Sequence, residues 1–343
     1  MKIAKNKNYT VKVIRTEKET EVNIAINNDK FSLYRYRPIN KHTINQFIKD
    51  EIYATCPVAF NDPYDAAVRF SERQIKKHIK SSLVKNNKFL KRLLKQNNLH
   101  CSQINELVNC IYERDLAPDI QFGNNVYAFA CFSTDVNQEI MWAHYAGLAT
   151  GFVLEYDYST LRRIGIEHQE SIFDIVSELD VIKGYSFNKD IIHDPLLPVI
   201  YQNDKYNVTD LCNNYIDAVL EKIDADGGYN PIVFPLEQSL KNYNEKETIH
   251  FIQNAYYRKK LPWYYENEWR LIGYNYNPII GRANDNYVKL GVAKPKAVYL
   301  GEKISEYDKG AIIEIARKKE LDVYIMKTVI IGNTLKLKPK KVT

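Results

Sequence analysis

The order of hydrophobic and polar positions predicts both strands and helices along most of the chain. Alternation and short apolar runs predict strands at residues 33–37, 52–56, 126–132, 151–157, 181–187, 297–300, 322–327 and 334–338. Apolar residues at helical spacing predict helices at residues 43–49, around 141–145, at 248–258 and 305–319, and within 71–115. We therefore expect an α+β fold with a central mixed, mostly antiparallel sheet.

These elements indicate one main domain with additions. Residues 1–30 form an N-terminal extension that predicts a hairpin, because apolar residues alternate at Val11, Val13, Val22 and Ile24. We expect residues 31–343 to form a single catalytic-like domain, with helical insertions at about residues 71–118 and 188–244. Asp135 and Gln138 have the spacing of a capping box for the helix at 141–145.

The most distinctive segment is residues 263–272, WYYENEWRLI, in which charged and apolar positions alternate. If this segment is extended, Glu266, Glu268 and Arg270 share one face of a strand. Buried charges need partners, because an unpaired one is costly. The pattern indicates either a functional site or a buried ionic network in which Arg270 and an arginine of residues 33–37 neutralise the two glutamates.

Composition narrows the class of protein only a little. Of 343 residues, 45% are hydrophobic and 26% are charged, as in a soluble globular protein. The net charge of +6 permits contact with nucleic acid without requiring it. The five cysteines include no C-x-x-C pair, and the sequence has neither an apolar targeting segment nor a run of about eighteen apolar residues. We therefore expect a reduced, cytoplasmic protein with no membrane partner.

Six segments occur in an order that resembles the bacterial family known as domain of unknown function 2971. They are LYRYRPIN, AFNDPYD, ACFSTDVNQEIMWAHYAG, GFVLEYD, KKLPWYYENEWRL and KAVYLGEKIS, between about residues 33 and 338. The N-terminal extension and residues 188–244 depart from the family pattern.

The same layout resembles, more distantly, the ADP-ribosyltransferase superfamily. In that superfamily a first-strand Arg or His holds NAD, a middle strand carries a hydroxyl residue and aromatics, and a late strand supplies a glutamate. The corresponding residues here are Arg35 or Arg37, Ser133 with Tyr145, and Glu266 with Glu268. The resemblance implies an ADP-ribosyltransferase-like sheet and an NAD-using effector, such as a toxin or an anti-phage defence protein. Its acceptor would be a nucleic acid or a protein, and it would have an antitoxin or defence-system partner.

This hypothesis assigns roles to the charged candidates. Glu268 would stabilise positive charge on the ribose as nicotinamide leaves, and Glu266 would orient or deprotonate the acceptor. Arg35 or Arg37 would hold the pyrophosphate bidentately, and Arg270 also belongs to the predicted NAD-binding set.

The helix at 141–145 supplies further candidates. His144 would polarise a hydroxyl of the ligand, although a lone histidine is commonly a hydrogen-bonded core or rim residue. Tyr145 and Trp142 would stack on nicotinamide, although core packing is favoured for Trp142.

Two other functions stay open. A metal-dependent nuclease would use Asp62, Asp65, Glu266 and Glu268, although a turn is the simpler explanation for FNDPYD and we expect no metal. A non-enzymatic sensor would bind nucleic acid or a protein through its basic helices and tail. The sequence contains no P-loop, no G-x-S-x-G elbow, no zinc-ligand spacing and no Gly-rich dinucleotide fingerprint.

Overall fold

The computed structural model describes most of the chain. The described residues are 2–5, 8–15, 20–62, 65, 71–85, 101–113, 127–183, 194–203, 207, 209, 212–213, 216–217, 256–277, 282–283 and 287–342. Among these residues, no helix is both long and apolar enough to cross a membrane.

Ten strands make up the central sheet. They are β4 (Ser32–Arg37), β5 (Glu51–Thr55), β6 (Tyr127–Ser133), β7 (Phe152–Asp157), β8 (Leu196–Pro198), β11 (Glu268–Tyr274), β14 (Tyr287–Val292), β15 (Ala297–Leu300), β16 (Asp322–Ile331) and β17 (Thr334–Lys341). Smaller sheets are formed by β1 (Lys2–Lys5), β2 (Tyr9–Arg15) and β3 (Thr20–Ile26), by β9 (Ile200–Tyr201) with β10 (Arg258–Lys259), and by β12 (Tyr276–Asn277) with β13 (Arg282–Ala283).

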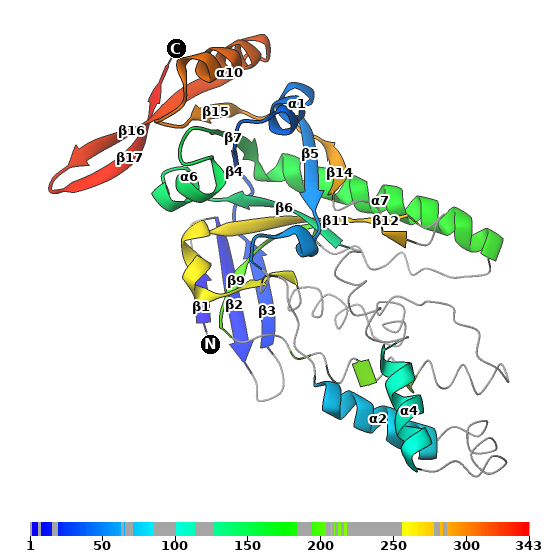
Figure 1. Cartoon of the computed structure of the whole chain (residues 1–343). Helices are drawn as coiled ribbons and strands as arrows, with labels where there is room; N and C mark the ends of the chain where they lie inside the picture. The colour runs from blue at the N-terminus through cyan, green and yellow to red at the C-terminus, as the bar shows by residue number, and fades with distance from the viewer. Residues whose placement is uncertain are drawn as a thin grey trace.

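Figure 1 shows the described helices, of which Glu72–Lys85 and Cys101–Ile111 lie together, away from the central sheet. The α-helices are α1 (Lys41–Lys49), α2 (Glu72–Lys85), α4 (Cys101–Ile111), α6 (Glu139–Tyr145), α7 (Tyr158–Lys183) and α10 (Glu306–Lys318). Two short 3-10 helices are η1 (Pro57–Ala59) and η4 (Leu261–Glu266).

The strand order confirms the predicted α+β class. The central sheet runs β14-β5-β6-β4-β7-β15-β16-β17, with β11 paired along β6 and β8 paired with β11. All these pairs are antiparallel except β15 with β16, which is parallel. The sheet is therefore mixed and mostly antiparallel, as the hydrophobic pattern predicts.

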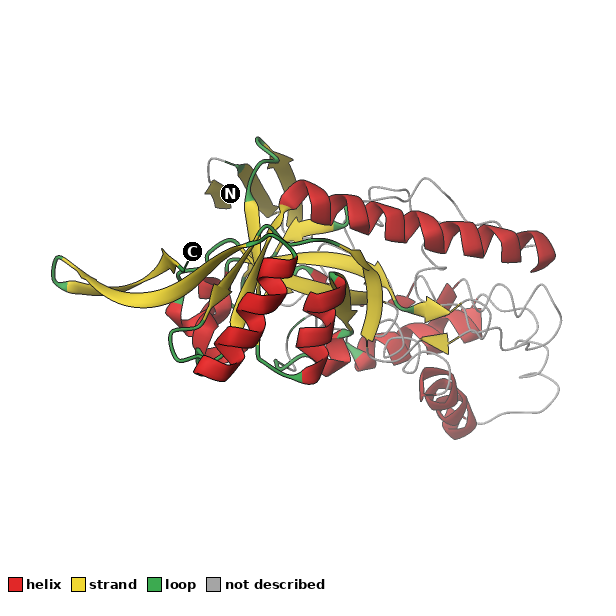
Figure 2. Ribbon diagram, turned by 90° about the horizontal axis from the view of Figure 1, so that it is seen from above, coloured by secondary structure: helices red, strands yellow, loops and turns green. Residues whose placement is uncertain are grey.

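The two faces of the sheet are covered differently (Figure 2). On one face, Trp269 lies opposite Phe132 and packs in the main hydrophobic core with residues of α1, α7 and α10. On the other face, Trp142 of α6 packs against Tyr36 in a smaller core. Glu268 and Arg270 alternate with Trp269 along β11, so they belong to this second face.

Several predicted elements are confirmed, including the strands at residues 33–37 and 297–300 and the helix at 305–319. In the N-terminal extension, Val11 pairs with Ile24 and Val13 with Val22, and β1 adds a third strand to the predicted hairpin.

Three local predictions differ from the structure. Residues 181–183 belong to α7 and not to a strand, because the proline-free stretch from Tyr158 carries the helix through them. The capping box is absent because the Asp135 carboxylate accepts from the nearby Asn137 amide, while Gln138 is the N-cap. Residues 196–198 and 200–201, inside the predicted helical insertion at 188–244, form β8 and β9.

Other predicted segments fall on parts of the chain that the structure does not describe. Residues 184–187, most of 188–244 and residues 248–255 of the predicted helix at 248–258 lie outside the described residues. Helices α2 and α4 occupy described parts of the predicted helical insertion at 71–118.

Candidate functional site

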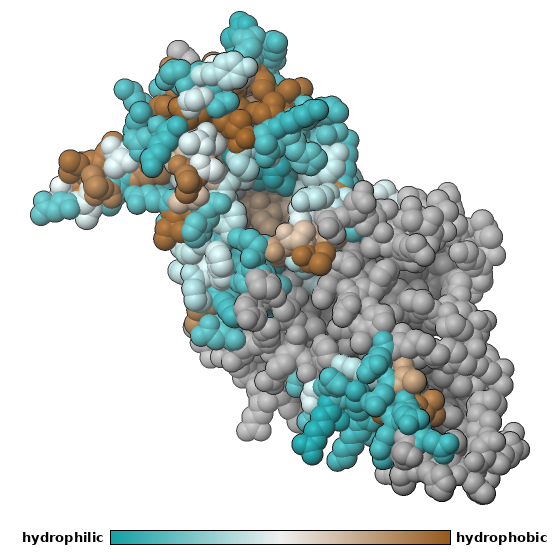
Figure 3. Space-filling model, in the orientation of Figure 1, coloured by the Kyte–Doolittle hydropathy of each residue, from teal (hydrophilic) through white to brown (hydrophobic). Residues whose placement is uncertain are grey.

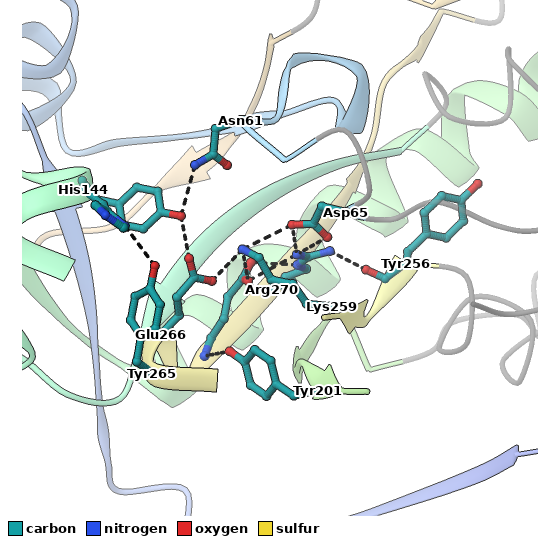
Figure 4. A network of polar contacts seen from close by, with 11 residues as sticks. Asn61, Asp65, His144, Tyr201, Tyr256, Lys259, Tyr265, Glu266 and Arg270 are labelled. Carbon is teal, nitrogen blue, oxygen red and sulfur yellow. Dashed lines mark hydrogen bonds and ion pairs between the residues drawn. The ribbon is translucent and has the colours of Figure 1, made fainter. Parts of the chain in front are cut away.

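Five buried charged side chains meet on the second face of the sheet, around β11 (Figure 4). They are Asp65, Lys259, Glu266, Glu268 and Arg270, and we call them the charged cluster. Each is less than a tenth exposed. Three carboxylates therefore share two cations in a place from which most water is excluded, so contacts among these charges are strong.

The local backbone explains how the two glutamates meet. Residues 261–266 form the 3-10 helix η4, with Pro262 in its first turn, and not the extended strand that alternation predicts. Asn267 then adopts a left-handed conformation with φ 44° and ψ 47°, and β11 begins at Glu268. The turn at Asn267 redirects the chain, so Glu266 and Glu268 both reach Lys259 although they come from different elements.

Arg270 is fully buried at the centre of the cluster. Its Nε donates to Glu268 Oε1 at 2.8 Å, and one terminal nitrogen donates to both oxygens of Asp65 at 2.7 Å. Its other terminal nitrogen donates to the backbone carbonyl of Tyr256 at 2.7 Å. This guanidinium is held in one orientation, because each of its three nitrogens donates to a described acceptor.

Lys259 lies between all three carboxylates. Its Nζ donates to Glu266 Oε2 at 2.6 Å and to Glu268 Oε2 at 3.1 Å, and lies 3.3 Å from Asp65 Oδ2. The nitrogen is also 5.0 Å from the centre of the Trp263 ring, within the range of a cation–π contact. The lysine is thus the shared counter-ion of the cluster.

The two glutamates hold protons differently. Burial tends to raise the pKa of Glu268, but Arg270 and Lys259 outweigh burial and hold that pKa below its ordinary value. Burial and the nearby charge of Glu268 raise the pKa of Glu266 to about 7, even though Lys259 and Tyr145 donate to it. Three carboxylates face only two cations, and Glu266 contacts just one of them, so Glu266 is the carboxylate of the two glutamates that takes up a proton more readily.

A row of polar and aromatic groups leads from Glu266 toward the surface. The Tyr145 hydroxyl donates to Glu266 Oε1 at 2.5 Å, and Asn61 Nδ2 donates to that hydroxyl at 3.3 Å. Nearby, His144 Nδ1 and the Tyr265 hydroxyl lie 2.9 Å apart. Tyr264 is 64% exposed, so the 3-10 helix presents an aromatic rim beside a buried carboxylate.

Cys131 lies on the same face of the sheet as the charged cluster. It lies directly opposite Arg270 in the β6–β11 register, and its thiol is hydrogen-bonded to Glu268. The side chain is exposed to solvent, yet surrounding protein atoms raise the pKa of its thiol well above the ordinary value. Cys131 is therefore an exposed neighbour of a cluster whose own side chains are buried.

Arg35 and Arg37, the predicted pyrophosphate-binding residues, do not share a face of the sheet with Glu268. Arg35 alternates with Tyr34, which shares a face with Ser133 and Glu268, so Arg35 and Arg37 lie on the opposite face. Arg35 donates to the Tyr53 carbonyl, and Arg37 donates to Gln46. The first-strand arginines therefore also take no part in neutralising the glutamates.

The remaining predicted residues divide into two groups. Trp142 is buried in the smaller core and donates to the Val136 carbonyl, so it fills the core as favoured. Ser133 lies opposite Glu268, but its hydroxyl accepts from the Asp135 amide in a local turn. Tyr145 touches Glu266 directly, while exposed His144 stands at the rim.

Sequence reasoning missed the role of Lys259 and considered Asp65 only as a metal ligand. Lys259 lies on the two-residue strand β10, too short for any periodic pattern. Asp65 follows a turn in which its amide donates to the Asp62 carbonyl, as FNDPYD predicts. Charge balance in the sequence could have indicated Lys259, because two buried glutamates and one arginine require a further cation.

The cluster does not have the arrangement of a metal centre. Within the described part of the chain, no group of three or more His, Cys, Asp and Glu side chains is placed to hold a metal ion. The ammonium of Lys259 occupies the position between Asp65, Glu266 and Glu268 where such an ion would sit. This geometry gives no support to the nuclease hypothesis.

Comparisons with known proteins bear on family and not on activity. Neither the curated proteins nor the solved structures contain a match to this chain. The model of a family described as a protein of unknown function (DUF2971) matches residues 141–271. This range contains Tyr145 and four of the five residues of the charged cluster, all except Asp65. The match over residues 141–271 supports the placement in the DUF2971 family that the sequence motifs indicate.

Proposed function

We propose that this protein transfers ADP-ribose from NAD to an acceptor, with Glu268 and Glu266 acting on the bond between nicotinamide and ribose. The observation that carries the proposal is the pair of glutamates with opposite pKa shifts, Glu268 lowered and Glu266 raised to about 7. Neighbouring carboxylates with such different pKa values commonly divide electrostatic and acid–base roles between them.

The chemistry requires both roles. When the C1′–N bond breaks, its electron pair leaves with nicotinamide and neutralises the pyridinium, while positive charge develops on the ribose. The ionised Glu268 stabilises that charge. The acceptor then supplies the electron pair of the new bond at C1′, and Glu266 takes the proton that the acceptor loses. A base with a pKa of about 7 suits this transfer near neutral pH.

The surroundings of the glutamates support the same proposal. Cys131, which is bonded to Glu268, is exposed to solvent, and the aromatic rim of Trp263, Tyr264 and Tyr265 offers faces for a nicotinamide ring. A phosphate contact from Arg35 or Arg37 is not part of the proposal, because these arginines lie on the opposite face of the sheet.

A structural role for the charged cluster is the competing explanation. It is favoured by the dense mutual pairing, in which Arg270 is fully buried and donates to Asp65, to Glu268 and to a backbone carbonyl. In that case the cluster would hold β11 to the loop at Asp65 and would have no turnover. The two roles differ in what a substitution of Glu268 changes.

The test is nicotinamide release and label transfer from NAD, with purified protein supplied with nucleic acid or cell extract. In Glu268→Gln, we expect transfer to fall about 100-fold or more, the size of effect seen when a transition-state charge contact is removed. Glu155→Gln is the matched control, because Glu155 is a partly buried carboxylate that accepts from Ser32 and Tyr299 outside the cluster. Circular dichroism reports whether each variant is folded.

Two outcomes would reject the proposal. One is full NAD turnover in folded Glu268→Gln. The other is no nicotinamide release from wild-type protein with any acceptor, together with a large loss of stability in Glu268→Gln, which would assign the cluster a structural role.

A further inference from the structure

The β16–β17 hairpin projects beyond the body of the protein (Figures 1 and 2). Strand β15 pairs with β16 only from Asp322 to Ile325, whereas β16 and β17 pair with each other as far as Ile331 and Thr334. Beyond Ile325, the described strands offer the hairpin no further strand partner. Gly332, with φ 62°, makes the turn at the tip. The outer part of the hairpin is therefore a two-stranded arm.

One face of this arm is lined with lysines. The register places Lys327 opposite Lys338 and Val329 opposite Lys336, and Lys340 lies opposite Ile325 on the same face. All four lysines are exposed. Directly opposed like charges destabilise a hairpin, so the pair of Lys327 and Lys338 costs stability in the absence of a partner.

The lysine face has little compensating charge of its own. The sequence contains no Asp or Glu after Asp322, and Lys341 is the lysine that pairs with that residue. Among the residues that the structure describes, Lys336, Lys338 and Lys340 form no ion pair. Lys327 is the exception, since it lies close enough to Glu302 to influence that carboxylate. The arm therefore carries an unbalanced positive field.

The tip of the arm is apolar and exposed. Ile330 is 77% exposed and Leu335 is 66% exposed, and the two lie opposite each other in the register. Ile331, next to the turn, is 47% exposed. Figure 3 shows hydrophobic surface beside hydrophilic surface on the projecting hairpin. Toward the base, Thr328 is bonded to Glu302, which ties the arm to the loop after β15.

We propose that the β16–β17 hairpin binds double-stranded DNA, with the lysine face along the phosphate backbone and the apolar tip in a groove. Lysines at alternate positions of a strand recur about every 6.6 Å, which presents regularly spaced cations to a regularly spaced polyanion. A two-stranded ribbon fits the major groove of DNA, where exposed apolar side chains can contact the methyl groups of thymine.

A second copy of the chain fits the arm less well. A two-fold contact uses the same surface on both copies, so a contact through the lysine face would bring lysines against lysines and increase the repulsion. A polyanion removes that repulsion. DNA binding by the arm is independent of the proposed transferase activity. If the protein is a transferase, DNA binding implies that nucleic acid is its preferred acceptor, and this one implication rests on the proposed function.

The experiment measures binding of a fluorescein-labelled DNA duplex of about 20 base pairs, long enough for a whole phosphate contact surface. Fluorescence anisotropy is recorded with the full chain, without NAD, at several salt concentrations. In the variant Lys336→Gln, Lys338→Gln, Lys340→Gln, we expect the slope of log affinity against log salt to become shallower by about 2.7, or about 0.9 for each lost phosphate contact. The corresponding triple change to Arg should keep the slope.

A matched control removes the same charge elsewhere. Lys289, Lys296 and Lys318 are exposed and paired with Glu51, Asp157 and Glu314, respectively, so changing all three to Gln also lowers the net charge by three. We expect this control to bind DNA nearly as wild type. The variant Ile330→Ser, Leu335→Ser should weaken binding at every salt concentration without changing the slope, because the tip contacts no phosphate.

Other results would overturn the proposal. It fails if the arm variant and the control have equal slopes, or if wild-type protein does not bind the duplex at about 50 mM salt, where phosphate contacts are strongest. It also fails if sedimentation shows that the tip variant converts a dimer to a monomer while DNA affinity stays the same, because the partner would then be a second copy. None of these readouts uses NAD, so the transferase proposal can fail independently.

Discussion

Glu266 and Glu268 are only two positions apart, yet their environments differ in the number of cations they contact. Glu268 is bonded by both Lys259 and Arg270, whereas Glu266 is bonded by Lys259 and by the neutral hydroxyl of Tyr145. This difference raises the pKa of Glu266 and lowers that of Glu268, and it makes the free energy of unfolding depend on pH.

We expect Glu266 to make the folded protein less stable as pH rises from about 5 to about 8. Its pKa is about 7 when folded and 4.5 in its ordinary state, so in this window the folded chain holds a proton that the unfolded chain has released. Raising the pH removes that advantage, by up to about 3 kcal/mol for a shift of this size.

The measurement is the free energy of unfolding in urea between pH 5 and pH 8. Glu266→Gln should match wild type at pH 5 and should be the more stable protein at pH 8. Glu155→Gln should follow the wild-type pH dependence over this range. An unchanged difference between wild type and Glu266→Gln at all pH values would show that Glu266 titrates normally.

At this scale, the sequence predicts the members of the site that carry a local pattern. Four predicted residues lie together in the structure, and each comes from a motif that the sequence shows: Tyr145, Glu266, Glu268 and Arg270. Lys259 carries no such pattern. Arg35 and Arg37 have suitable chemistry, but they lie on the face of the sheet opposite Glu268. A strand sends alternate side chains to opposite faces, and only the pairing of the strands shows which face lies beside the glutamates.

At the scale of elements, the connection between η4 and β11 decides where Glu266 points. The connection consists of one residue, Asn267, in the left-handed conformation with φ 44°. Asn and Gly adopt this conformation readily, whereas β-branched residues do not.

We therefore expect Asn267→Gly to keep both stability and activity, and Asn267→Val to lose about 1–2 kcal/mol of stability through backbone strain. The Val variant should also lose activity beyond its loss of stability, because Glu266 would shift relative to Glu268. Thermal unfolding and NAD turnover at a temperature where both variants are folded provide the check. Equal behaviour of the two variants would show that the turn does not position Glu266.

Elements with their own periodicity are predicted well, and those set by tertiary contact are not. Strand β7 and helix α10 follow clear patterns and form as expected. Alternating charged and apolar residues predict a strand where the 3-10 helix η4 forms. Pro262 and the turn at Asn267 prevent a continuous extended backbone there. Strands β8 and β9 are three and two residues long and depend on β11 and β10 for their partners.

At the scale of the whole molecule, the charged cluster joins distant parts of the chain. Arg270 and Asp65 are 205 positions apart, and their contact ties the loop after η1 to β11. Alternation along single segments gives the α+β class, but it contains no information about which distant segments meet. The pairing of charges across the sheet is therefore a property of the fold that the sequence pattern does not reveal.

We expect Arg270→Met to lower the free energy of unfolding by about 3–5 kcal/mol, because Asp65 and Glu268 would each lose a buried partner. Arg317→Met is the control, since Arg317 forms a pair with Glu314 on the exposed surface of α10, and its loss should change the free energy of unfolding far less. Urea denaturation followed by circular dichroism measures both. A loss below about 1 kcal/mol for Arg270→Met would mean that water enters and solvates the carboxylates.

The long separation between Asp65 and Arg270 also has a consequence for the protein while it is being made. A ribosome adds about 5–20 residues per second, so the 205 positions between the two residues take about 10–40 seconds to translate. During that interval Asp65 has left the ribosome before its two cationic partners exist. The emerging chain therefore cannot assemble the cluster until β11 has been synthesised, and any chemistry that depends on the cluster is withheld until β11 has left the ribosome.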